Sequence, residues 1–125
     1  MAAIIVKSEG SLLIVYVSGI LTTEEVTSVF DRYYTNKVIK DVIWDLSIGS
    51  LVSISEDGYK AIAHAANHAI SSGSRKGGKT AFVGLEDIEY GLLKMYSAIA
   101  IETGVPTKYH VFRTTEEARE WIATY

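Results

Sequence analysis

The sequence predicts an α/β fold in which one domain, residues 1–125, holds a mixed, mostly parallel sheet of about five strands and four helices. Three observations lead to this expectation. The length is close to the commonest size of a single domain. Short β-branched runs alternate with longer segments whose apolar residues recur every three to four positions. Strands joined through helices of that length pair in parallel through right-handed crossovers. The expected order is β-β-α-β-α-β-α-β-α.

The chain begins with a predicted hairpin and a helix. Residues 3–7 and 12–18 are rich in β-branched and aliphatic side chains, and a Gly-containing connection separates them. Thr22 stands three residues before Glu25 and forms a capping-box pattern, so the first helix is expected at about 22–36. Its expected core stripe is Val26, Val29, Phe30 and Tyr33.

The middle of the chain predicts a strand, a helix and a second strand. Residues 38–47 form a short run rich in Val, Ile and Trp. Ser55 offers a hydroxyl cap for a helix that ends near Gly73, and the next strand follows at 79–85. The expected core stripe of this helix is Tyr59, Ile62, Ala63, Ala66 and Ile70.

The last part predicts a helix at about 86–103 that closes before Gly104, a strand at 108–112, and a final helix that Thr114 caps. The core stripe expected for the third helix is Ile88, Leu92, Met95, Tyr96 and Ile99. The stripe expected for the last helix is Ala118, Trp121, Ile122 and Tyr125.

The stretch "GSRKGGKT", residues 73–80, matches the phosphate-binding loop pattern G-x-x-x-x-G-K-[ST]. A working loop of this kind follows a strand and opens a helix, whose N-terminus attracts phosphate. Here the stretch follows a helix and enters a strand, so the nearest helix end repels phosphate. We therefore interpret it as a connection with solvated Arg75, Lys76 and Lys79, and we reject nucleotide binding.

Other candidate chemistry is sparse, and the sequence predicts no catalytic residue, no metal ligand set and no cofactor. His64 and His68 share one helix face at metal-binding spacing, but no third ligand is evident, and both are expected to point outward. His110 is interpreted as a packed or edge residue. Asp45 is expected to be partly desolvated and held by neighbouring backbone N–H groups.

The third helix carries apolar residues on two faces. The face expected to lie opposite the core holds Tyr90, Leu93 and Ile101 around Ser97. Three interpretations stay open: scattered surface hydrophobics, a self-associating surface, or a groove for a lipid-like ligand. We favour the self-associating surface.

Composition excludes several classes of function. A formal net charge of -3 offers no basic footprint for nucleic acid. The longest apolar runs fall far short of the ~20 residues of a membrane helix, so no membrane span is expected. The absence of cysteine excludes disulfides and thiolate metal sites. The first residues do not read as a signal peptide, and a cytoplasmic location is expected.

Four stretches of the chain resemble a known family: "VSGILTTEEV", "VIWDLS", "KTAFVG" with "LEDIEYGLLKMY", and "YHVFRTTEEAREWI". They resemble the STAS-like superfamily of bacterial anti-sigma-factor antagonists, and more closely its SpoIIAA-like branch, which is related in fold to STAS/SEC14 domains. The resemblance covers almost the whole chain and implies a SpoIIAA-like fold. It also implies a non-enzymatic binding or regulatory module.

In the antagonist family a strand ending in an Asp-Leu-Ser-like run is followed by a serine that a partner kinase phosphorylates at the start of a helix. Ser55 falls at that position in "DLSIGSLVSISEDGY". Glu56 and Asp57 follow it and disfavour an added phosphate by like-charge repulsion. Ser55 is therefore interpreted first as a helix cap and second as a candidate phosphorylation site.

The sequence thus predicts a protein that acts through contacts with a protein partner or with itself. The alternatives are a partner-switching regulator gated by phosphorylation of Ser55, and a carrier of a small apolar or lipid-like ligand.

Overall fold

The computed structural model describes residues 2–71 and 77–124 of the chain. Its elements follow the predicted order, with one additional π-helical turn, η1, after the first helix. They are β1 (Ala2–Glu9), β2 (Leu12–Ile20), α1 (Thr23–Val29), η1 (Phe30–Tyr34), β3 (Asp41–Ser50), α2 (Glu56–Ser71), β4 (Lys79–Val83), α3 (Asp87–Thr103), β5 (Lys108–Phe112) and α4 (Thr115–Ile122).

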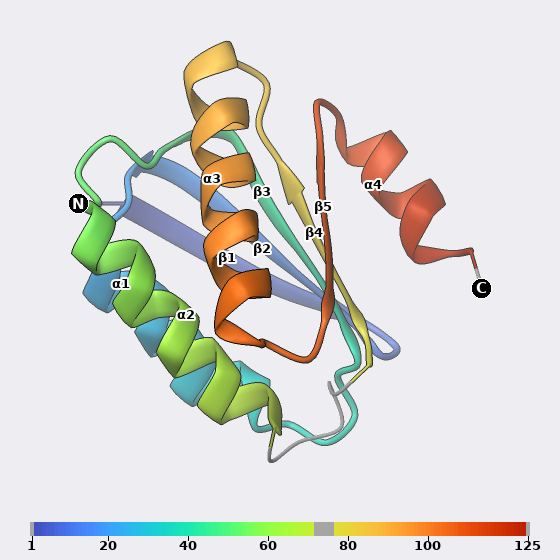
Figure 1. Cartoon of the computed structure of the whole chain (residues 1–125). Helices are drawn as coiled ribbons and strands as arrows, with labels where there is room; N and C mark the ends of the chain where they lie inside the picture. The colour runs from blue at the N-terminus through green and yellow to red at the C-terminus, as the bar shows by residue number, and fades with distance from the viewer. Residues whose placement is uncertain (1, 72–76, 125) are drawn as a thin grey trace.

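The sheet has five strands in the order β1-β2-β3-β4-β5 (Figure 1). β1 pairs antiparallel with β2 through a tight hairpin in which Gly10 takes the left-handed conformation at φ 61°. All other neighbouring strands are parallel, as predicted. The carboxyl ends of β2, β3 and β4 therefore lie at the same edge of the sheet, and the helices that follow these strands begin there.

Helices cover both faces of the sheet, but unequally. α1, α2 and α3 lie on one face, and α4 lies on the other (Figure 1). The larger core joins the first three helices to Val15, Trp44 and Phe82 on the central strands. The smaller core joins Ala118 of α4 to Ile43 and neighbouring side chains on the opposite face. Since α4 spans only eight residues, it leaves the β1 side of that face bare, where Ile5 is 60% exposed.

The sequence patterns located the caps and most of the core stripes. The Thr22 and Glu25 capping box is present, and the Thr114 hydroxyl accepts a hydrogen bond from the Glu117 amide. The buried stripe of α2 is the predicted one. On α4, Ala118 is buried while Trp121 and Ile122 pack partly buried against the same core, and Tyr125 lies outside the described residues.

The first helix departs from prediction at its last turn. Its π-helical turn adds backbone between successive turns, so Tyr34 reaches the core and Tyr33 is only half-buried. The Tyr34 hydroxyl accepts a hydrogen bond of 2.9 Å from the Trp44 indole N–H, so this buried hydroxyl has a polar partner.

The predicted core stripe of α3 is only partly right: Tyr96 is buried, Leu92 and Ile99 pack partly buried against the core, and Ile88 and Met95 are exposed. The helix buries Glu89, Leu93, Tyr96, Ser97 and Ala100, whereas Ile88 and Met95 are 65% and 41% exposed. Both stripes have helical spacing, so periodicity alone does not choose between them. Ser97 and Ala100 share the buried stripe with larger side chains. α3 packs closely on the end of β4, because a Cβ added at Gly84 would lie 3.0 Å from the Tyr90 backbone nitrogen.

Candidate functional site

Exposed apolar side chains gather at the edge of the sheet where β2, β3 and β4 end. We call this set the carboxyl-edge surface. It comprises Ile20, Ile48, Val52, Leu85 and Ile88. These side chains are 44% to 77% exposed. Of the other large hydrophobics that are exposed in residues 2–71 and 77–124, Ile5 lines the same surface hollow as Ile48, whereas Val38, Met95 and Ile101 lie in other parts of the molecule.

A β-bulge turns one member of this surface outward. β2 and β3 pair regularly up to Tyr16 and Asp45, after which Ser18 lies opposite Ile48, so β3 contains one extra residue. The extra residue reverses the alternation of side chains along the end of β3. Ile48 consequently lies on the face that α4 leaves open, with 77% of its surface exposed.

The loop between β3 and α2 is held rigidly by Leu51. The Leu51 amide donates to Glu89 Oε2 at 2.9 Å, and its carbonyl accepts from the Ile54 amide at 3.0 Å. The Tyr59 hydroxyl also lies 3.4 Å from this carbonyl. Glu89 is a buried residue in the first turn of α3, so it ties the loop to a second helix. Val52, the next residue, is therefore presented from a fixed backbone.

Burial and the neighbouring Glu89 carboxylate raise the pKa of Tyr59 to about 12. The unfolded chain releases this proton near pH 10, so the folded state holds it more tightly between pH 10 and 12. Stability from Tyr59 is thus full below pH 10 and is lost as pH rises toward 12. We expect urea unfolding to show a smaller loss of stability from pH 8 to pH 11 in Tyr59→Phe than in the wild type. An equal loss in both proteins would contradict this assignment.

Ser55 has the capping role expected from the sequence. Its hydroxyl accepts a hydrogen bond of 3.0 Å from the Gly58 amide, one turn into α2. The residue is exposed, and the exposed carboxylates of Glu56 and Asp57 follow it. The hydroxyl is therefore accessible at the border of the carboxyl-edge surface, in an acidic setting.

The predicted interface on α3 is divided by the fold. Leu93 and Ser97 are buried in the core, with exposed fractions of 3% and 8%, so the expectation that they form an outer surface is wrong. Ile101 is exposed near the end of the helix. Tyr90 is half-buried, and the Arg113 guanidinium lies 4.0 Å from the centre of its ring. These four residues do not make one surface patch.

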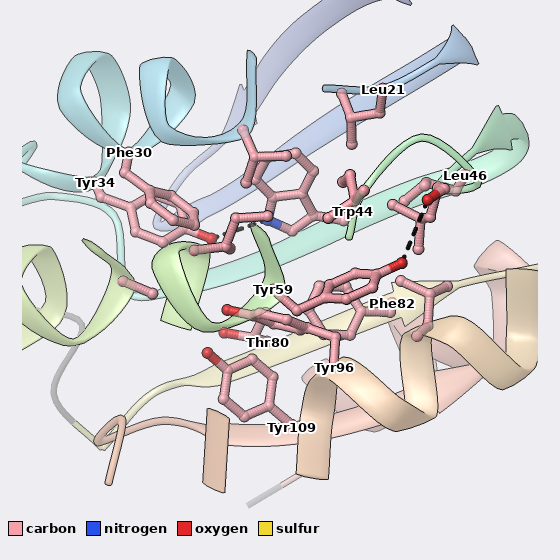
Figure 2. Close-up of a pocket in the computed structure, with 16 residues that line it drawn as sticks. Leu21, Phe30, Tyr34, Trp44, Leu46, Tyr59, Thr80, Phe82, Tyr96 and Tyr109 are labelled. Carbon is pink, nitrogen blue, oxygen red and sulfur yellow. Dashed lines mark hydrogen bonds between the residues drawn. The ribbon is translucent and has the colours of Figure 1, made fainter. Parts of the chain in front are cut away.

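A small cavity of about 40 Å³ lies between the sheet and the helices α1, α2 and α3 (Figure 2). Its walls combine aliphatic side chains with seven aromatic ones: Phe30, Tyr34, Trp44, Tyr59, Phe82, Tyr96 and Tyr109. Figure 2 shows the hydroxyl groups of Thr80, Tyr96 and Tyr109 close together at one end. Burial, and then the adjacent Tyr109 hydroxyl, raise the pKa of Tyr96 above its usual value. The cavity has room for about three water molecules.

The other candidate residues occupy structural positions. Asp45 is half-buried and accepts hydrogen bonds from the Ser47 amide at 2.9 Å and from the Thr115 hydroxyl at 2.9 Å. His64 and His68 are both exposed on α2, as predicted. No group of three or more potential metal ligands occurs in the described part of the chain. His110 lies on the edge strand β5, where its ring stacks on Phe112.

The glycine- and lysine-rich stretch joins the end of α2 to the start of β4, the order that led us to reject a phosphate loop. Arg75 and Lys76 lie outside the described residues. Lys79 was expected to be solvated, but its ammonium is bound to the protein. Its ammonium donates to the Trp121 carbonyl at 2.8 Å and to the Thr124 hydroxyl at 2.9 Å. A cation at these last carbonyls complements the dipole of α4, so Lys79 stabilises that helix.

Comparison with known proteins supports the fold. No protein-family model and no curated protein matches the sequence. The anti-sigma factor antagonist SpoIIAA in its unphosphorylated form is similar in structure, with a TM-score of 0.61 and 12% identity over 98% of this chain and 100% of that chain. An uncharacterised DUF3478-family protein with a SpoIIAA-like fold from Shewanella loihica PV-4 has a TM-score of 0.51 and 14% identity over 98% and 94%.

These similarities show that the chain has a SpoIIAA-like α/β fold, which confirms the resemblance at the level of architecture. Among the described residues no helix has the length and apolar character needed to cross a membrane.

Sequence reasoning missed the carboxyl-edge surface and Glu89. The surface was missed because its members come from three separate stretches of the chain, and Ile88 was assigned by its spacing to the core of the third helix. One signal was available: Ile48 and Val52 both follow the predicted end of a strand at residue 47, in a region otherwise rich in Ser and Gly. Glu89 gave no signal, because an acidic residue in a first helical turn is usually solvated.

Proposed function

We propose that this chain is a non-catalytic binding module that recognises a protein partner through its carboxyl-edge surface. The observation that carries the proposal is the concentration of exposed Ile, Leu and Val side chains at this one edge. A contiguous exposed apolar region on a soluble domain usually marks a partner-binding site.

The architecture around this surface also favours binding. The Leu51 amide is hydrogen-bonded to Glu89, so the adjacent Val52 loses little conformational entropy when a partner covers it. Two polar side chains near the surface already have structural partners, since Ser55 caps α2 and Asp45 accepts hydrogen bonds. This arrangement supports a surface that binds and does not perform chemistry. A solved protein with this fold is an anti-sigma factor antagonist, which is consistent with a protein partner.

Self-association is one form of such a contact. Because Leu93 and Ser97 are buried, it would use the carboxyl-edge surface and not the α3 patch expected from the sequence. A carrier of a lipid-like ligand is less well supported, because pockets for ligands of that size usually occupy about 300–1,000 Å³ and the internal cavity has about 40 Å³.

Gating by phosphorylation is a second candidate function, which the exposure of the Ser55 hydroxyl beside this surface favours. Incubation of the purified chain with ATP and kinases from the source cells, followed by intact-mass measurement, tests it. A single phosphate that disappears in Ser55→Ala supports gating, and an unchanged mass in the wild type refutes it.

The binding proposal is tested with a photo-cross-linking amino acid placed at position 52 or, as a control, at position 38. Val52 and Val38 are loop valines that are 60% and 65% exposed, but Val38 lies away from the carboxyl edge. In source cells we expect discrete cross-linked species from position 52. We expect none of these same species from position 38. Cross-linking of the purified chain alone identifies self-association.

A second variant makes the outcome decisive. Val52→Asp should abolish the cross-links that form from a probe at position 48, because a carboxylate buried in an apolar contact loses its hydration. Val38→Asp should leave them unchanged. Identical cross-linking patterns from positions 52 and 38 would refute the proposed surface.

A further inference from the structure

Carboxylates are concentrated at the same edge of the sheet as the carboxyl-edge surface. Each of the four α-helices carries two acidic residues in its first turn. They are Glu24 and Glu25, Glu56 and Asp57, Asp87 and Glu89, and Glu116 and Glu117. Glu86 adds another at the start of α3, where its side chain makes no capping hydrogen bond.

Each pair has a local cause, since a carboxylate in the first turn complements the helix dipole. The order of the strands brings these acidic pairs to one edge of the sheet. The helices that follow parallel strands all begin at the carboxyl edge of the sheet, so their acidic first turns lie along one edge, with that of α4 on the opposite face (Figure 1). Most of these side chains, including Glu24, Glu56 and Glu86, are exposed to solvent.

Nearby cations neutralise only part of this charge. Arg113 donates to Asp87 Oδ1 at 2.7 Å and also to the Leu85 carbonyl, so it is already bound. Lys60 approaches Glu56 only to 3.7 Å, in a pair with both side chains largely exposed. Lys94 lies further along α3, 5.0 Å from the centre of the Tyr90 ring. Lys40, before β3, and Lys108, at the start of β5, lie at the opposite edge. The chain therefore has an acidic carboxyl edge.

We propose that the partner segment that docks on the carboxyl-edge surface is cationic, with Lys or Arg side chains flanking the apolar residues that cover Val52 and Ile88. This inference rests on the proposed function and specifies the chemistry of its partner. Apolar contact supplies the buried area, while the acidic surroundings steer cations toward the edge and oppose acidic partners. A two-fold contact between the same edges of two copies would place carboxylates against carboxylates, so the inference favours a different chain.

The probe for this inference is a library of random peptides displayed on phage and selected on the immobilised chain at low salt. We expect the enriched peptides to carry Lys or Arg next to apolar residues. Their binding should be lost in Val52→Asp and retained in Val38→Asp, which locates it on the carboxyl-edge surface.

A charge-matched pair of variants isolates the role of the acidic edge. Glu56→Gln with Glu86→Gln removes two exposed carboxylates beside the surface, whereas Asp31→Asn with Glu102→Gln removes two exposed carboxylates elsewhere. Both double variants change the net charge equally. We expect the first to slow association with a selected peptide by about threefold or more and to reduce its dependence on salt. The second should bind as the wild type does.

The outcomes separate the two proposals. Enriched peptides that depend on Val52 but carry no cations, or equal effects of the two double variants, overturn the cationic partner and leave the binding surface standing. If selection enriches no peptide that depends on Val52, both the surface and its cationic partner are overturned.

Discussion

Truncating Tyr96 to alanine should lower the free energy of unfolding by about 3–5 kcal/mol, the range for removal of a large aromatic side chain from a core. Tyr96 is 6% exposed on α3. Its ring centre lies 5.7 Å from that of Phe82 and 6.0 Å from that of Tyr109. Removing the ring deletes these contacts and enlarges the existing cavity of about 40 Å³. Urea unfolding followed by circular dichroism measures the loss.

The neighbouring residue provides the control. Met95 is 41% exposed, so Met95→Ala should change stability by less than about 0.5 kcal/mol, as surface substitutions usually do. The pair also tests which face of α3 is buried, because the sequence pattern placed Met95 in the core. A loss of similar size in both variants would contradict the orientation of α3.

The second large effect is expected at Gly84, which lies between β4 and α3. A Cβ at this position would come within 3.0 Å of both the Tyr90 backbone nitrogen and the Leu93 Cδ1 atom. Backbone cannot move aside as a flexible side chain can, so Gly84→Ala should push α3 away from the sheet. We expect a loss of about 1–3 kcal/mol, the usual cost of overpacking, measured by thermal and urea unfolding.

Gly91, on the exposed side of the same helix, is the matched control. A Cβ there meets no atom within 4 Å. Gly91→Ala should therefore stabilise the protein by about 0.5–1 kcal/mol, because alanine loses less backbone entropy than glycine in a helix. Should both substitutions stabilise the chain, the close approach of α3 to β4 would be wrong.

The contact at Gly84 also bears on the candidate binding site. It sets the position of the first turn of α3, which carries Glu89 and exposes Ile88. Glu89 in turn holds the Leu51 amide and so positions Val52. The carboxyl-edge surface is thus assembled by packing between elements that lie far apart in the sequence. A variant that shifts α3 without unfolding the chain is expected to weaken partner binding as well.

The sequence by itself determined the element order, the parallel connections and the helix caps. These features depend on interactions between residues a few positions apart. Thr22 and Glu25 cap one helix, Ser55 and Gly58 another, and the α2 stripe follows from one unambiguous apolar period. Such short-range patterns can be read along the chain, and they led to the SpoIIAA-like architecture that the structural comparisons support.

Only the tertiary structure decided which face of α3 is buried, how the π-helical turn brings Tyr34 to Trp44, and where the carboxyl-edge surface lies. On α3 two stripes have the same helical period, and the close approach of the helix to Gly84 buries the one that includes Leu93 and Ser97. The surface likewise combines the ends of three strands with the start of a helix, and a bulge in β3 reverses the direction of Ile48. These features depend on contacts between segments that are distant in the sequence. Local sequence patterns do not predict them, because the burial of a side chain is decided by how the whole molecule packs.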